Sequence, residues 1–198
     1  ALGASSAFAG SHTGSITAVS WGGAYTKSQI EAYHKPWNAE TGNTVVSEDY
    51  SGGLAEIKTQ VETGSVTWDV VDVELSDAIR GCDEGLFEEI DHSVLPAALD
   101  GTSAVDDFID GALHDCAVGN IVWSTLIAFD KTKYANEPTT MADFFNIDKF
   151  PGKRGMRKSP KAMLEMALMG DGVPAEEVYD LLNTDEGLDR AFAKLDTI

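Results

Sequence analysis

Aromatic residues and glycines stand together in two short segments that each follow a predicted strand. Trp21-Gly22 and Tyr25 belong to the first segment, and Tyr50-Ser51, followed by Gly52-Gly53, form the second. Aromatic rings offer flat apolar faces that attract cations, and glycine lets the backbone approach a ligand closely. Each residue alone is more typical of a core or a turn. Together they predict a site that binds a small solute without reacting with it.

Three carboxylates bracket a third predicted strand. Asp69 and Asp72 are three positions apart and point to opposite faces of a strand, whereas Asp72 and Glu74 share a face. The latter pair is suited to receive an ammonium group. The same residues also fit ordinary capping of a helix that starts near Ser76. From the sequence, both interpretations stay open.

Motifs of known catalytic chemistry are missing from the chain. There is no G-x-S-x-G elbow, no P-loop, no G-x-G-x-x-G and no H-E-x-x-H. The four histidines are scattered singly at His12, His34, His92 and His114. We therefore expect no catalytic residue, no metal ligand and no cofactor.

The only two cysteines, Cys82 and Cys116, are too far apart to form a C-x-x-C motif. In an oxidising compartment they are able to form a disulfide, which closes a loop of about 35 residues and is worth ~3–4 kcal/mol. The alternative is two buried thiols. The N-terminus favours the disulfide, because Ala7-Phe8-Ala9 fits the small-x-small rule of signal-peptide cleavage, with a cut near Ala9 and export to the periplasm.

The first half of the chain alternates strands and helices. Strands are predicted at 15–20, 43–48 and 68–73, with helices between them that end near Gly42 and Gly64. This pattern predicts a parallel sheet with helices on its faces, and ligands of such sheets bind beyond the carboxyl ends of the strands. Those ends carry the aromatic, glycine and carboxylate residues described above. Thr26 and Gln29 are spaced as a capping box at the first helix, and Pro36 is expected to kink or shorten it.

The second half carries fewer clear signals. A β-rich stretch is expected at 115–129 and a strand at 153–157, and Ser159-Pro160 has the composition of a helix start. Further helices are expected at 141–145, after Pro174 and after Thr184.

Composition narrows the classes of function. The formal net charge is -19, and the one basic cluster is small, so nucleic acid is not expected as a partner. A mean hydropathy of -0.14 and the lack of long apolar runs argue against a membrane protein. The basic cluster consists of Lys153, Arg154, Arg157, Lys158 and Lys161.

Four segments resemble the family 1 periplasmic solute-binding proteins of ABC importers, the spermidine/putrescine-type binding proteins. They are SITAVSWGGAYTKSQIEAYHKPWNAETG, TWDVVDVELSDAIRGCDEGLFEEID, VGNIVWSTLIAFDKTKY and FPGKRGMRKSPKAMLEMAL. The resemblance implies an α/β, periplasmic-binding-protein-like fold of two lobes, with parallel or mixed sheets, helices on both faces and a hinge. It places the first lobe at 15–125 and an incomplete second lobe at 126–198, after a signal remnant and flexible N-terminus at 1–14.

The resemblance also implies a monomer that captures a small amine-containing solute between its lobes and delivers it to permease and ATPase subunits. The ligand residues it implies are Trp21, Gly22, Tyr25, Tyr50, Ser51, Glu74, Trp123, Ser124, Arg157, Lys158 and Ser159.

Two departures from the family pattern matter. Family members are longer, so the chain is expected to be a truncated member. Polyamine binders also place acidic residues where this chain has Lys158-Ser159, and cations there favour a ligand with a carboxylate, such as γ-aminobutyrate (GABA). Polyamine and ω-amino carboxylate both remain candidate ligands. The candidate from another class is an enzyme of unrecognised type on a similar sheet, which no nucleophile–base pair supports.

Overall fold

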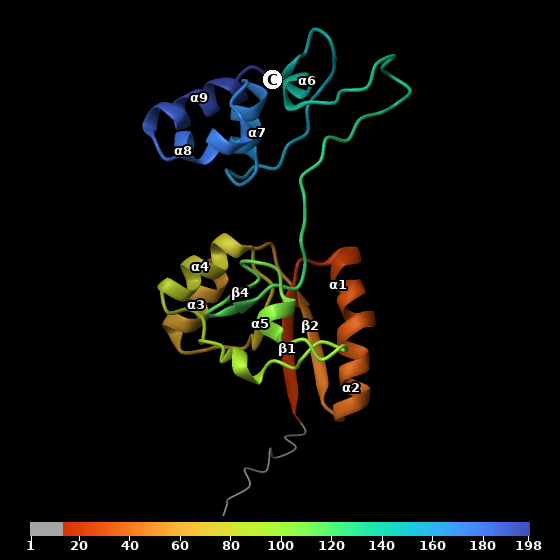
Figure 1. Cartoon of the computed structure of the whole chain (residues 1–198), viewed down its shortest axis with the longest axis vertical. Coiled ribbons are helices and arrows are strands. Elements are labelled where there is room, and N and C mark those ends of the chain that lie inside the picture. Colours follow the sequence, from red (N-terminus) through yellow and green to blue (C-terminus); the bar gives the residue numbers. More distant parts are fainter. Residues whose placement is uncertain (1–13) are drawn as a thin grey trace, which may run out of the picture. The chain divides into compact units, whose positions relative to one another are not determined.

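Figure 1 presents the computed structural model, which describes residues 14–198. The chain divides into two compact units, one ending at Ile121 and the other running from Val122 to Ile198. The predicted cleavage site at Ala7-Phe8-Ala9 lies outside the described residues.

The first unit is built around a parallel sheet. Its elements are β1 (Ser15–Ser20), α1 (Gly23–Gln29), η1 (Ile30–His34), α2 (Lys35–Thr41), β2 (Thr44–Asp49), α3 (Ala55–Thr63), β3 (Val70–Val71), α4 (Leu75–Asp83), η2 (His92–Val94), α5 (Ala104–Asp107), β4 (Leu113–His114) and β5 (Ala117–Val118).

The sheet has the strand order β2-β1-β3, with all three strands parallel. Ser20 pairs with Asp49 on one side of β1, and Val19 pairs with Val71 on the other. The crossovers from β1 to β2 and from β2 to β3 run in opposite directions, and right-handed crossovers then place their helices on opposite faces. Figure 1 shows α1 and α2 on one side of the strands and α3 and α4 on the other. The predicted β-α-β-α-β pattern is confirmed.

The first long helix accommodates a proline without breaking. Helical backbone continues from α1 through a turn of π-helix, η1, into α2, and Pro36 lies in the first turn of α2. Proline lacks an N–H and its ring crowds the carbonyl of the preceding turn, so a widened turn next to it relieves both problems. Gly42 and Gly64 adopt left-handed conformations with φ of 74° and 64° and end α2 and α3, as predicted.

The second unit is helical in the part of the chain that the structure describes. Its elements are α6 (Met141–Phe145), α7 (Met163–Gly170), η3 (Ala175–Glu177), α8 (Val178–Leu182) and α9 (Asp185–Leu195). They enclose a core of Phe145, Ala167, Leu168, Val173, Val178 and Ala191. The predicted helices at 141–145 and after Thr184 are confirmed. The hydroxyls of Thr140 and Thr184 cap these helices, because they accept the amides of Asp143 and Gly187.

Several predicted strands are shorter or absent. Within 68–73 only Val70–Val71 pair with β1, within 115–129 only Ala117–Val118 form a strand, and 153–157 take no regular structure. A strand exists only where a neighbouring strand accepts its backbone hydrogen bonds. Among the described residues, no strand lies alongside 153–157 or 119–130. The predicted strand at 153–157 is therefore wrong, and the predicted β-rich stretch at 115–129 holds only the two-residue strand β5.

Candidate functional site

The carboxyl ends of the three parallel strands meet at one edge of the first sheet. β1 leads into Trp21-Gly22, β2 into Tyr50-Ser51 and β3 into Asp72 and Glu74. The register brings these segments together, because Ser20 pairs with Asp49 and the amide of Asp72 donates to the carbonyl of Val19. This edge is where open parallel sheets bind ligands.

Three aromatic rings form a contiguous cluster at the edge. The centroids of Trp21 and Tyr50 lie 5.4 Å apart, and those of Tyr50 and Trp68 lie 5.5 Å apart with nearly perpendicular planes. The Trp21 ring lies directly over Gly52, where an added Cβ would come within 2.1 Å of the ring carbon Cζ3. Position 52 therefore needs a residue without a side chain, because any Cβ there would displace the Trp21 ring. Trp68 was not predicted as a site residue. It holds the aromatic cluster in place through its indole N–H, which donates to Glu48.

Tyr50 is more deeply placed than a ligand-facing ring needs to be. Only 9% of its surface is exposed, and its hydroxyl donates to the backbone carbonyl of Asp72. Burial raises the pKa of the Tyr50 hydroxyl well above its ordinary value, and the negative charges of Asp77, Asp72 and Glu74 raise it further. Tyr50 thus stays a neutral donor that ties the β2 loop to the β3 loop, with Ser51 exposed beside it.

Gly22 is the N-cap residue of α1 and has a positive φ of 80°, which favours glycine. Its amide donates to the Thr26 hydroxyl, which in turn donates to a carboxylate oxygen of Asp49 at 3.0 Å. The predicted capping box is wrong: Thr26 and Gln29 lie inside α1, and both are buried. The Thr26 hydroxyl instead donates to Asp49, the last residue of β2, and the Gln29 amide donates to Asp72, which follows β3. Both residues are therefore part of the edge.

Asp72 is the centre of this hydrogen-bond network. Its carboxylate accepts the Ser20 hydroxyl at 2.7 Å, the Gln29 amide at 2.5 Å and the Asn120 amide at 2.9 Å. All three donors are neutral, so dipoles hold the carboxylate in place and do not cancel its charge. Glu74 is the N-cap residue of α4, but its side chain makes no capping hydrogen bond. Glu74 thus occupies the N-cap position that the capping interpretation predicts, but its carboxylate does not cap α4.

Tyr25 completes the edge from α1. Its half-buried hydroxyl donates to Asn120 across a long distance of 3.4 Å. Burial raises the pKa of Tyr25, and the nearby charge of Asp72 raises it further, so the hydroxyl is neutral at physiological pH. Asn120 was not predicted. It follows β5, is 48 positions from Asp72 in the sequence, and no local signal marks it.

The predicted disulfide between Cys82 and Cys116 is present, with the two Cα atoms 5.7 Å apart. It joins α4, which starts just after the site carboxylates, to the segment that leads through β5 to Asn120. Phe87 packs beside it against Gly81, where a Cβ would come within 2.2 Å of the ring.

The predicted site residues of the second unit lie on irregular backbone. Trp123 is 54% exposed and Ser124 is exposed, both in the extended stretch after β5. Arg157 and Lys158 are exposed, and Ser159 is half-buried with its amide donating to the Arg157 carbonyl.

The predicted helix start at Ser159-Pro160 is wrong, because α7 begins at Met163 after Ala162, which adopts a left-handed φ of 66°. That conformation interrupts the helix, so Pro160 lies in the irregular segment before α7 and not in its first turn. Arg154, from the same basic cluster, has a structural role and donates to the backbone carbonyls of Phe144 and Phe150.

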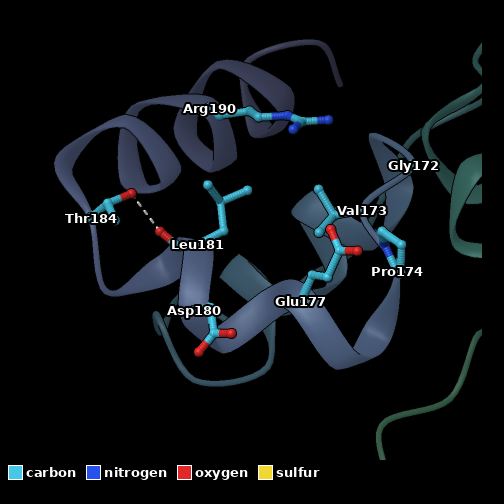
Figure 2. Close-up of a pocket in the computed structure, with 8 residues that line it drawn as sticks. All are labelled: Gly172, Val173, Pro174, Glu177, Asp180, Leu181, Thr184 and Arg190. Atoms are coloured by element: carbon cyan, nitrogen blue, oxygen red, sulfur yellow. Dashed lines mark hydrogen bonds between the residues drawn. The ribbon is translucent and has the colours of Figure 1, made fainter.

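A hollow of about 610 Å³ lies between the helices of the second unit, and none of the predicted site residues lines it. Figure 2 shows Val173, Leu181 and Glu177 directed toward it, with Arg190 on the neighbouring helix, and the Thr184 hydroxyl donating to the Leu181 carbonyl.

Neither a metal centre nor a membrane span is evident in residues 14–198. No group of three or more His, Cys, Asp or Glu side chains there is arranged to hold a metal ion. None of the helices in this range has the length and apolar content that crossing a bilayer requires.

Comparison with known families decides the class of protein. The family described as bacterial extracellular solute-binding protein matches residues 32–198. This chain belongs to that family. The predicted recognition of a solute-binding protein of ABC importers is confirmed, and so is the predicted periplasmic-binding-protein-like α/β fold.

Three relatives of this solute-binding protein are informative. The GABA-binding protein of Pseudomonas aeruginosa is 48% identical over 184 residues, which is 93% of this chain and 50% of the relative. The structure of MotA from A. tumefaciens B6 in complex with glucopine is 35% identical with a TM-score of 0.83, over 92% of this chain and 54% of MotA. The Atu4243 GABA receptor is 36% identical with a TM-score of 0.75, over 93% of this chain and 53% of the receptor.

The solute-binding protein therefore spans about half the length of these relatives. The descriptions of these three relatives name GABA and glucopine, and none of them names a polyamine.

Proposed function

We propose that this protein is the exported binding component of an ABC importer and that its ligand is an ω-amino carboxylate of the GABA type. The observation that carries the proposal is the 48% identity to a GABA-binding protein over nearly the whole chain. The likeness to a GABA receptor structure supports the same ligand class. We prefer this ligand to putrescine or spermidine.

The chemistry of the residues supports a ligand with two unlike ends. The edge of the first sheet offers carboxylates at Asp72 and Glu74 and aromatic faces at Trp21 and Tyr25, which together suit an ammonium group. A carboxylate end needs a cation, and Arg157 and Lys158 are the residues we assign to it. A diamine would instead need a second set of acids in place of these cations.

We further propose that binding occurs without reaction, in the periplasm, and that the ligand passes to permease and ATPase subunits. A passive role fits the edge, where the half-buried carboxylate of Asp72 is held by neutral donors and Tyr50 stays protonated. We assign residues 15–125 to the first lobe of the binding protein and residues 126–198 to the second lobe.

Thermal unfolding of the complete gene product with matched four-carbon solutes tests the ligand class. We expect GABA at 100-fold excess over its Kd to stabilise the fold by about 2.7 kcal/mol. Putrescine, which replaces the carboxylate end by a second amine, and butyrate, which lacks the amine, should give no shift. Mass spectrometry of the released ligand should recover GABA unchanged.

Each part of the proposal has its own contrary outcome. Stabilisation by putrescine and not by GABA would assign the protein to polyamines. A chemically altered ligand would favour the enzyme. Absence of any shift with all three solutes would remove the amino-carboxylate assignment altogether.

A further inference from the structure

Asn120 lies at the meeting point of three elements of the first unit. Its side-chain N–H donates to Asp72 at 2.9 Å, and its carbonyl oxygen accepts the Tyr25 hydroxyl at 3.4 Å. The orientation of this amide follows from chemistry, because the carboxylate of Asp72 is able only to accept, which leaves the amide oxygen for the tyrosine. One short side chain therefore links α1 to the end of β3.

The partner of Asn120 is already fixed from the inside. Ser20 and Gln29, which are only 4% and 6% exposed, hold one oxygen of Asp72, and Asn120 takes the other. Asn120 itself is exposed. Its contribution is thus directed outward, to Tyr25, whose hydroxyl interacts with Asp72 as well as with Asn120.

The backbone that carries Asn120 is weakly held by its own secondary structure. β4 and β5 pair over only two residues each, and a lone two-stranded hairpin is marginally stable. The Cys82–Cys116 disulfide ties this hairpin to α4, four residues before Asn120. Since α4 starts just after Asp72, the disulfide and the Asn120–Asp72 hydrogen bond close a ring through α4 and β5.

We propose that Asn120 is a positioning residue of the binding site, which holds the Tyr25 hydroxyl beside the Asp72 carboxylate, and that the disulfide keeps it in place. This inference rests on the proposed function, because the held pair is assigned to the amine end of the ligand. A pair fixed before binding costs less ordering entropy when the ligand arrives.

A charge-neutral swap tests the pairing on the complete gene product. Asn120→Asp sets two carboxylates against each other and removes the donor, whereas Asn120→Asp combined with Asp72→Asn restores one donor and one acceptor at the same place. Asn136→Asp, on an exposed residue of the second unit, adds the same charge elsewhere and serves as the control. Replacing both cysteines by serine tests the contribution of the disulfide.

Hydrogen exchange of residues 117–121 without ligand gives a readout that needs no knowledge of the solute. We expect faster exchange in Asn120→Asp and in the cysteine-free variant, and wild-type exchange in the swap and the control. In calorimetry, GABA should bind the single variant about tenfold more weakly or worse, and the control as the wild type does. The swap is judged by exchange alone, because it replaces the Asp72 carboxylate that is assigned to the amine of the ligand.

The two readouts separate the possible failures. If the wild type binds no GABA, the proposed function fails, and exchange alone still decides whether Asn120 holds the segment. Unchanged exchange in Asn120→Asp, or exchange in the swap that stays as fast as in the single variant, overturns the pairing. Faster exchange with unchanged GABA affinity overturns the positioning role and leaves Asn120 a purely structural residue.

Discussion

Gly52 and Gly53 form a matched pair at the residue scale. Their φ angles are 84° and 83°, so alanine meets the same backbone penalty at both positions, roughly 1 kcal/mol or somewhat more. The space around them differs. A Cβ on Gly52 falls within 2.1 Å of the Trp21 ring, whereas nothing lies within 4 Å of a Cβ on Gly53.

We therefore expect Gly52→Ala to lower the free energy of unfolding by about 1–3 kcal/mol more than Gly53→Ala, because Trp21 must leave its place against Tyr50. Urea unfolding of both variants measures the difference, and near-ultraviolet circular dichroism reports the tryptophan. Equal losses of stability in the two variants would mean that the Trp21 contact with Gly52 has no energetic weight.

At this scale, the sequence predicted which residue types gather at the edge but not how they contact one another. Trp21, Gly22 and Tyr25 were selected because they follow a strand. Thr26, Gln29 and Asn120 were misread or missed because their partners are Asp49 and Asp72, which are 23 to 48 positions away. Side-chain hydrogen bonds over such separations leave no trace in local spacing.

Asp171 connects two elements of the second unit. It follows α7, and its carboxylate accepts the Arg190 guanidinium of α9 at 2.7 Å, with Lys194 of the same helix at 3.6 Å. The hydrogen bond and charge of Arg190 lower the pKa of Asp171 below its ordinary value. A carboxyl group with a lowered pKa in the folded state stabilises the fold above its unfolded pKa of about 3.9, and that contribution is lost as the pH falls.

Asp171→Asn should therefore destabilise the protein at pH 7 and have progressively less effect as the pH drops below about 4. Both side chains are more than a third exposed, so solvent screening limits the loss at pH 7 to about 1 kcal/mol or less. Urea unfolding at a series of pH values, with Asp180→Asn on the neighbouring α8 as the control, measures it. A loss of stability in Asp171→Asn that is independent of pH would contradict an ionic origin.

Elements with local signals were predictable, and elements that depend on distant partners were not. Thr140 and Thr184 cap α6 and α9 through amides three residues ahead, so their signal lies in the sequence itself. The segment 153–157 needed a neighbouring strand, and α7 starts late because Ala162 takes an unusual conformation. Neither condition can be read from propensity.

At the scale of the whole molecule, charge is distributed unevenly. The residues up to Ile121 include 20 of the 33 Asp and Glu but only four of the 14 Lys and Arg, whereas the second unit has 13 acids and ten bases. The first unit thus carries a formal charge of -16 and the second of -3. Repulsion among like charges opposes the compact state, and most of this repulsion belongs to the unit with the candidate site.

Added salt should therefore stabilise the protein, because screening weakens this excess repulsion more than it weakens isolated surface pairs such as Lys58–Glu84. Raising NaCl from 10 to 200 mM shortens the Debye length from about 30 to about 7 Å, and we expect a gain of about 1 kcal/mol, or 2–4 °C in Tm. Calorimetry with sucrose at matched osmolality separates screening from surface exclusion. The gain in Tm should be larger for a transition that unfolds the first unit, because that unit carries most of the acidic excess. A Tm that stays constant or falls over this range of salt would indicate that the surface ion pairs outweigh the repulsion among the acidic residues.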